Sequence, residues 1–341
     1  MVANPARRPL RSPHHPFRQL IHRPALVPPF PAPTCRKFLS RLSIYGDFWP
    51  RLLSLAARVT PWFLEPLLLA LYSTLFYLAC GPARRALLHN LQVLFPNDSL
   101  LIRHARALRV IWNFACTLTD AAHIRANHDI IDWEIDGLDH LNTLSNLPSG
   151  AVILTAHMGN YDLAAPLFAA RLQRKLHLVR APERHQESQA YASTQRDHMN
   201  ADWCVIHYNE PGNMLAVKLT SLLKEDQIVA IQGDRILFDV AATTLPFSPQ
   251  HDWHLPSGPF VLGLVSRAPL VPLFITRSGW RRYRVTAHPP YHWPEGRLDK
   301  ATALRDAELW WSHLLSQTVR QHWHQWFVFE PAFTPTAAPP P

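Results

Sequence analysis

The chain has 341 residues, of which 48% are hydrophobic and 17% charged, so it contains enough apolar material for a large folded core. Glycine is scarce, and the sequence has no G-x-G-x-x-G, G-x-x-x-x-G-K-[ST] or G-x-S-x-G pattern, which counts against a dinucleotide-binding fingerprint, a P-loop NTPase and the usual hydrolase elbow. The four cysteines form no C-x-x-C pair, so they predict no metal centre and suit a reducing compartment.

The positive charge is concentrated at the N-terminus. Residues 1–41 contain eight Lys or Arg residues and no Asp or Glu, which leaves 26 basic and 25 acidic residues in the rest of the chain. This arm and residues 331–341 are rich in proline, and such segments bury too little surface to offset the entropy of ordering. We therefore predict that both ends are disordered and that the arm lies in solvent near an anionic membrane. An accidental extension of the reading frame and, less favoured, nucleic-acid binding are the alternatives.

Residues 62–80 form a long apolar stretch in which Glu65 is the only charged residue. Nineteen residues of helix measure roughly 28 Å, about the thickness of the hydrocarbon region of a bilayer. The stretch therefore predicts a helix that spans a membrane or lies on it, and a buried core helix is the alternative. Apolar residues at spacings of three and four then predict amphipathic helices over 82–95 and 99–124. We expect residues 42–125 to form a helical, membrane-associated part.

From about residue 126 the pattern changes to short apolar runs separated by helical stretches. Strands that alternate with helices predict βαβ units, so we expect one α/β catalytic domain over residues 126–330, with a mostly parallel central sheet flanked by helices. The expected strands are 130–135, 151–156, 176–180, 203–207, 228–232, 270–276 and 283–287, and the expected helices are 161–172, 186–200, 212–225, 257–267 and 301–323.

The sequence AVILTAHMGNYDLAAPL, residues 151–167, contains the first candidate site. An apolar strand runs into His157, Gly159 and Asn160 suit a turn, and a helix follows. The histidine is thus expected at the carboxyl end of a strand, where open α/β sheets place their sites. Asp162 falls near the first helical turn, where its carboxylate is expected to accept a hydrogen bond from one imidazole nitrogen and leave the other as a base for acyl transfer to a hydroxyl. A surface histidine with a helix-capping aspartate is the alternative.

The sequence IVAIQGDRILFD, residues 228–239, contains the second candidate. Here a predicted strand ends in Gly233, Asp234 and Arg235. The aspartate can order a basic group, and the arginine can bind a phosphate through two nitrogens. A salt bridge within a turn is the alternative.

The third candidate is the start of the apolar helix expected at 257–267. Ser257 is expected to be its N-cap, with Gly258 and Pro259 in the first turn. The backbone amides at a helix N-terminus bind anions, although most helix starts have no such ligand.

Five short sequence blocks, taken in chain order, resemble those of the bacterial lysophospholipid acyltransferase-like superfamily. The blocks are LTAHMGNYDLAA, LVRAPE, IQGDR, LPFS and LPSGPFVLGLVSRAPLVPLFITR. The resemblance is closest to the late (lauroyl and myristoyl) acyltransferases of lipid A biosynthesis and covers roughly residues 50–330. It implies that His157 and Asp162 are the catalytic pair of an H-x-x-x-x-[DE] motif. The residues expected to bind substrate are Gly159, Asn160, Arg180, Gly233, Asp234, Arg235, Ser257, Gly258 and Pro259.

The resemblance implies an O-acyltransferase at the inner (cytoplasmic) membrane, with its catalytic domain facing the cytoplasm. His157 is expected to be the general base and Asp162 to fix its tautomer, while Arg180, Asp234 and Arg235 position anionic or polyol head groups. The expected donor is an acyl-carrier protein thioester or acyl-CoA, the acceptor is a lipid or glycolipid, and no metal, organic cofactor or nucleic acid is implied. The alternatives are an esterase or thioesterase on the same scaffold and a non-enzymatic lipid-binding relative. Acyl-chain length, donor, acceptor and oligomeric state stay open.

Overall fold

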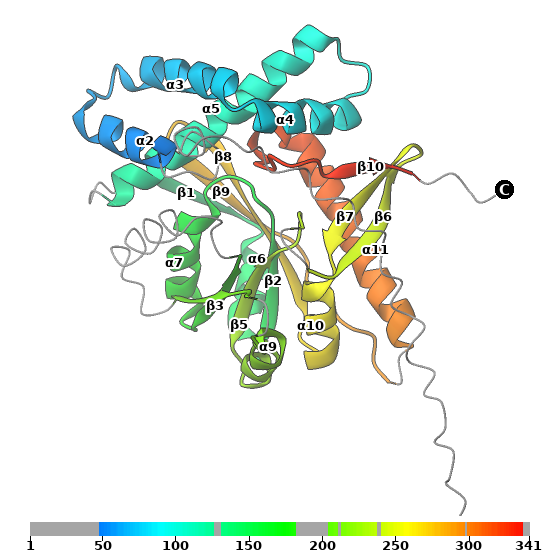
Figure 1. Cartoon of the computed structure of the whole chain (residues 1–341). Coiled ribbons are helices and arrows are strands. Elements are labelled where there is room, and N and C mark those ends of the chain that lie inside the picture. Colours follow the sequence, from blue (N-terminus) through cyan, green and yellow to red (C-terminus); the bar gives the residue numbers. More distant parts are fainter. Residues whose placement is uncertain are drawn as a thin grey trace, which may run out of the picture.

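The computed structural model describes residues 48–125, 131–181, 204–210, 213–236, 240–296 and 299–336. Within these residues, a seven-stranded sheet forms the centre of the molecule, and a three-stranded sheet lies beside it (Figure 1). The predicted α/β class with a mostly parallel central sheet is confirmed. The arm predicted at residues 1–41 and the helix predicted at 186–200 lie outside the described residues.

The strands of the central sheet are arranged in the order β1-β9-β8-β2-β5-β3-β4. The five strands from β8 to β4 run parallel, whereas β1 and β9 pair with each other in parallel and run against them. Each of the seven predicted strands is present. Their bounds are β1 (Asp132–Asp136), β2 (Ala151–Thr155), β3 (Leu176–Arg180), β4 (Cys204–Tyr208), β5 (Ile228–Gln232), β8 (Leu270–Gly279) and β9 (Arg282–Ala287).

Helices cover both faces of the sheet. Strand β2 lies near its centre and is fully buried, which explains its uninterrupted apolar sequence. Because successive side chains of a strand point to opposite faces, Val152 and Leu154 join the core with α9, α10 and α11, whereas Ala151 and Ile153 join the core with α6 and α7. The bounds of these helices are α6 (Leu138–Asn146), α7 (Tyr161–Leu172), α9 (Leu215–Lys224), α10 (Gly258–Ser266) and α11 (Lys300–Gln321).

The small sheet was not predicted from the sequence. It consists of the hairpin β6 (Ala242–Ser248) and β7 (His251–Pro256), with β10 (Phe333–Pro335) paired antiparallel to β7. In β6 only Leu245 is buried, so this strand gives no apolar run in the sequence. The buried ring of Phe333 packs on Trp253 with centroids 5.5 Å apart. The predicted start of the disordered tail at residue 331 is therefore too early in the chain, because the fold extends through β10, which ends at Pro335.

In the part of the chain that the structure describes, four helices precede the sheet and form the upper layer in Figure 1. They are α2 (Phe48–Val59), α3 (Glu65–Ala79), α4 (Gly81–Leu94) and α5 (Leu100–Arg125). The helices predicted at 62–80, 82–95 and 99–124 correspond to α3, α4 and α5, and α2 is additional. Among the described residues, no single helix has both the length and the apolar composition to cross a membrane. Helices α3 and α4 meet those two criteria only as a pair, and they are bent by 94° where they meet.

The residues after α11 connect the helical layer with the sheets; we call residues 322–333 the C-terminal segment. Phe327 and Phe329 pack into the core of the N-terminal helices, with ring centroids 5.3 and 5.0 Å from that of Phe114. Trp326, which precedes them, and Val328, which lies between them, belong instead to the core under the small sheet. The segment runs beside α4, where Asn90 donates hydrogen bonds to backbone carbonyls of Val328 and Glu330 (Figure 1). Both parts of the molecule therefore depend on it.

Candidate active site

The candidate site lies where β2 and β5 end. These neighbouring strands are parallel and in register, with Thr155 opposite Gln232. His157 and Asp234 follow these two residues by the same number of positions, so the register brings them together although they are 77 residues apart. The carboxyl edge of a parallel sheet is where α/β folds place their sites.

Asp234 accepts three hydrogen bonds. Its Oδ1 lies 2.7 Å from Nδ1 of His157. Its Oδ2 accepts the backbone N–H of His157 at 2.9 Å and the indole N–H of Trp326 at 3.0 Å. The side chain of Asp234 is 0% exposed. A carboxylate that accepts the proton on Nδ1 fixes the imidazole tautomer in which Nε2 carries the free lone pair.

The ionisation of this pair suits a base. Burial lowers the pKa of His157, and the charge of Asp234 opposes this effect without overcoming it. Burial raises the pKa of Asp234, but the charge and hydrogen bonds of His157 lower it more, so that the pKa lies below its usual value. At neutral pH the pair is thus a neutral imidazole beside a carboxylate, which is the state in which a general base is ready to take a proton.

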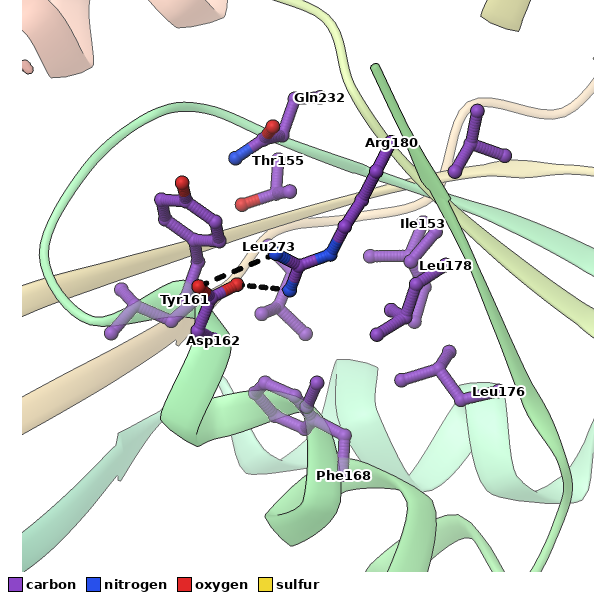
Figure 2. Close-up of a pocket in the computed structure, with 14 residues that line it drawn as sticks. Ile153, Thr155, Tyr161, Asp162, Phe168, Leu176, Leu178, Arg180, Gln232 and Leu273 are labelled. Carbon is purple, nitrogen blue, oxygen red and sulfur yellow. Dashed lines mark hydrogen bonds and ion pairs between the residues drawn. The ribbon is translucent and has the colours of Figure 1, made fainter. Parts of the chain in front are cut away.

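The expected hydrogen bond between Asp162 and His157 is not formed, which corrects the sequence-based prediction. Asp162 lies in the first turn of α7, and its carboxylate pairs with the guanidinium of Arg180 at the end of β3 (Figure 2). Nδ1 of His157 is already occupied by Asp234, and a guanidinium offers a carboxylate two charge-assisted donors, which a neutral imidazole cannot match. Burial lowers the pKa of Arg180, but Asp162 raises it more, so the guanidinium stays charged.

A pocket of about 530 Å³, its open mouth included, lies between α7 and the central sheet. Figure 2 shows Asp162, Arg180, Tyr161 and Thr155 gathered at one end. The rest of the lining is mainly apolar and includes Ile153, Phe168, Leu176, Leu178 and Leu273, with Phe168 and Leu176 farthest from the polar group. Tyr161 links the pocket to the base, because its ring packs edge-on against that of His157 at 5.7 Å. Burial raises the pKa of Tyr161 to about 12, so its hydroxyl is neutral.

Gly159 and Asn160 hold the turn that follows His157. Gly159 has φ of +53°, and a Cβ at this position would lie 2.4 Å from the backbone oxygen of Ile275, so only glycine fits. Asn160 is buried, and its amide donates to the carbonyl of Thr117 in α5 at 3.1 Å. The contacts of both predicted site residues are therefore with the protein itself and fix the position of the histidine.

Gly159→Ala is expected to lower the melting temperature and to displace His157. The substitution combines an unfavourable backbone conformation, which costs about 1–3 kcal/mol, with a clash against backbone that cannot move away. The matched control is Gly258→Ala, because a Cβ at Gly258 has no neighbour within 4 Å. Thermal unfolding of both variants checks the prediction, and equal melting temperatures would contradict it.

The loop at residues 233–235 is fixed by tryptophans and an ion pair. The carbonyl of Gly233 accepts the indole N–H of Trp311 at 2.8 Å, and a Cβ on Gly233 would meet that indole at 3.1 Å. Arg235 pairs with Glu330 of the C-terminal segment at 3.1 Å. Complete burial of Asp234 also means that it does not face a substrate head group, contrary to the role expected from the sequence.

The third predicted site is the start of α10. Ser257 occupies the N-cap position of α10, as expected, but its side chain makes no capping hydrogen bond, and Gly258 is exposed while Pro259 is buried. Among the hydrogen bonds and ion pairs of the described residues, none joins this helix start to His157 or Arg180. The described residues also contain no group of three His, Cys, Asp or Glu side chains placed to hold a metal ion.

Trp326 is the site residue that the sequence analysis missed. It lies in the aromatic sequence QHWHQWFVF, residues 321–329, just beyond the helix predicted at 301–323. Nothing in that sequence indicates a contact with Asp234, 92 positions earlier. The only signal in the sequence is that a tryptophan, whose indole N–H can donate a hydrogen bond, follows several polar residues.

A neutral histidine with a buried carboxylate partner, beside a pocket that is polar at one end and otherwise lined by apolar side chains, fits the chemistry of acyl transfer. The sequence profile of one family, described as bacterial lipid A biosynthesis acyltransferase, matches residues 38–334. The chain belongs to the bacterial lipid A biosynthesis acyltransferase family and is an acyltransferase. Membership implies an acyl donor and a lipid acceptor. A search of curated proteins finds no match.

Proposed function

We propose that this protein is a membrane-associated O-acyltransferase that moves a fatty acyl chain from a thioester to a hydroxyl group of a lipid or glycolipid. The observation that carries the proposal is the His157–Asp234 pair, in which the imidazole is neutral and oriented by a buried carboxylate. The neighbouring pocket supports it, because a fatty acyl chain needs an apolar enclosure close to the base.

In the proposed reaction, Nε2 of His157 takes the proton of the acceptor hydroxyl while the oxygen attacks the thioester carbonyl. The tetrahedral intermediate then collapses, the carbon–sulfur bond breaks, and the imidazolium returns its proton to the leaving thiolate. Asp234 stabilises the imidazolium through the short bond to Nδ1. The donor supplies the activated acyl group, so these steps require no metal or organic cofactor. An acyl-carrier protein or acyl-CoA is the proposed donor.

Asp162 and Arg180 are proposed to act together at the polar end of the pocket. Asp162 holds the guanidinium across the polar end, where Arg180 can contact an anionic part of the donor or acceptor (Figure 2). The apolar end of the pocket is proposed to take the acyl chain. This assigns Asp162 to substrate positioning and leaves orientation of the base to Asp234.

Product analysis tests the reaction class. The purified full chain is incubated with an acyl-carrier protein thioester or with acyl-CoA, with and without total lipid from a Gram-negative inner membrane, and products are identified by mass spectrometry. The proposal expects an acylated lipid only when acceptor is present, and little free fatty acid without it. Release of free fatty acid at the same rate in both samples would favour the esterase or thioesterase alternative. Lipid extracts from cells with and without the gene then identify the acceptor.

The proposed localisation is the cytoplasmic face of the inner membrane, with binding through α2 and α3. Leu67, Leu71, Leu75 and Leu78 are each about half exposed or more, and their spacing of four and three places them on one face of α3. An apolar groove of about 670 Å³, its mouth included, separates α2 from α3. Glu65, the one charge in this stretch, is buried and pairs with Arg281, so it does not oppose burial of the apolar face in lipid.

A triple variant, Leu71→Glu/Leu75→Glu/Leu78→Glu, is expected to lose binding to vesicles of phosphatidylethanolamine and phosphatidylglycerol in a flotation assay. The wild-type chain should stay bound at high salt, because burial of apolar side chains is not screened by ions, whereas contacts of a basic arm are. Met214→Glu/Val217→Glu, at exposed apolar positions near the start of α9, is the matched control and should bind normally. Release of the wild-type protein by salt alone would contradict the proposal.

A further inference from the structure

We propose that Trp326 is a positioning residue for acyl transfer: its indole N–H fixes the Asp234 carboxylate, and through it the orientation and tautomer of His157. The inference rests on the proposed function, because it assigns a role within the same reaction. Trp326 comes from the C-terminal segment, far in sequence from both strand ends that form the pair.

The bond from Trp326 completes the set of donors around Asp234. One carboxylate oxygen, Oδ1, faces the imidazole, and the other, Oδ2, accepts from the backbone of His157 and from Trp326. Two donors on Oδ2 prevent the short side chain from rotating, so Oδ1 stays aligned with Nδ1. Without the indole N–H, a single backbone donor would hold that oxygen, and the carboxylate would gain freedom about its terminal torsion.

Trp326 is itself held firmly. Its side chain is buried, and its ring stacks on that of Trp253 at 6.1 Å with an angle of 11° between the planes. The ring centroid of Phe333 lies 6.0 Å away. The backbone is tied to the catalytic loop, because Trp326 forms a β-bridge with Met158 and the N–H of Phe327 donates to the carbonyl of His157 at 2.8 Å. The donor and the residue that it positions are therefore parts of one rigid unit.

Removal of the indole N–H has an electrostatic consequence as well. A hydrogen bond donated to a carboxylate disperses its negative charge, so loss of this bond makes Asp234 a stronger partner for the imidazolium. The pKa of His157 is then expected to rise, and the acid limb of the activity profile to move to higher pH. The other charged groups that act on His157 are Arg235 and Glu330, which pair with each other, and a change confined to Trp326 leaves both in place.

Trp253 provides a matched control. It is as deeply buried as Trp326, stacks on the same ring, and carries an indole N–H that has no hydrogen-bond partner among the described residues. Trp326→Phe and Trp253→Phe therefore remove similar ring area from the same cluster. Only the first removes a donor to Asp234.

The experiment measures kcat and KM for donor and acceptor across pH with the full chain. For Trp326→Phe we expect kcat to fall about 10- to 100-fold, the range for a lost hydrogen bond to a charged group, with KM little changed and the acid limb shifted upward. Trp253→Phe should change neither the acid limb of the pH profile nor the turnover per folded molecule. Equal losses in both variants, or an unchanged kcat and acid limb in Trp326→Phe, would overturn the inference.

Two further variants separate a loss of the hydrogen bond from misfolding and from failure of the proposed base. If Trp326→Phe folds poorly, benzothienylalanine at position 326 keeps the shape of the indole and replaces only its N–H by sulfur, and the same pH profile decides the question. His157→Asn measured in parallel separates the two proposals. An inactive His157→Asn with a normal Trp326→Phe refutes only the positioning role, whereas an active His157→Asn refutes the proposed base and with it this inference.

Discussion

His157→Asn is expected to lower acyl transfer by at least ~10²–10⁴-fold, the contribution typical of a general base, while the protein stays folded. The asparagine amide can take the place of Nδ1 and continue to donate to Asp234, but the variant has no counterpart of Nε2 to accept the proton. His157→Ala is less suitable by itself. It removes one of the three donors to a fully buried carboxylate, and loss of a hydrogen bond to a charged group costs about 1.5–3 kcal/mol of stability.

The measurement is acyl transfer per folded molecule, with the melting temperature determined beside it. The wild-type rate should rise with pH as His157 loses its proton, and because burial lowers the pKa of this histidine, the rate should be level from neutral pH upward. Near-normal turnover by folded His157→Asn would remove the base from the mechanism. The lipid-binding alternative would then be favoured.

The second large effect is expected for Asp234→Asn, with a loss in kcat on the order of 10⁴-fold, as for the equivalent change in a Ser-His-Asp triad. The two N–H donors that face Oδ2 require an oxygen at that position, so the NH₂ group of an asparagine must face His157. Nδ1 then has to accept a hydrogen bond, which transfers the imidazole proton to Nε2. The base is present in this variant but in the wrong tautomer.

Asp162→Asn provides the contrast. It weakens the pair with Arg180 at a partly exposed position, so we expect a smaller loss of roughly 10- to 100-fold, expressed in KM as well as kcat. The double variant His157→Asn/Asp234→Asn should be hardly worse than the poorer single variant, because the two residues act as a unit. His157→Asn/Asp162→Asn should be additive in free energy. If Asp162→Asn matched Asp234→Asn in every respect, the division of roles between the two carboxylates would be wrong.

The sequence predicted the central sheet well because parallel strands covered on both faces appear as continuous apolar runs. It predicted neither β6 nor β7, because an edge hairpin with one buried residue on β6 leaves no such run. Helix α2 was missed for a related reason, since its apolar residues merge with those of the adjoining stretch. Local patterns therefore indicated the elements that are buried and periodic, and not those that depend on long-range contacts for their stability.

The candidate site divides in the same way. His157 and Asp234 were both identified as residues at strand ends, but the sequence paired the histidine with Asp162, which is closer in the chain. The correct partner depends on β2 and β5 being neighbours in register, with β3 lying outside them, and strand order is not visible in a single sequence. Arg180 and Asp162 were likewise predicted separately, and the structure brings them together.

The path of the C-terminal segment has a consequence for the biosynthesis of the enzyme. Every strand-end motif of the site has been translated once residue 235 is made, yet the last donor to Asp234 is Trp326, and β10 follows only at Phe333. A nascent or truncated chain that stops before Trp323 can contain the base, its carboxylate and the pocket residues and still lack the contact that aligns them. The catalytic motif and the competent catalyst therefore arise at different times, because Trp326 follows Asp234 by 92 positions.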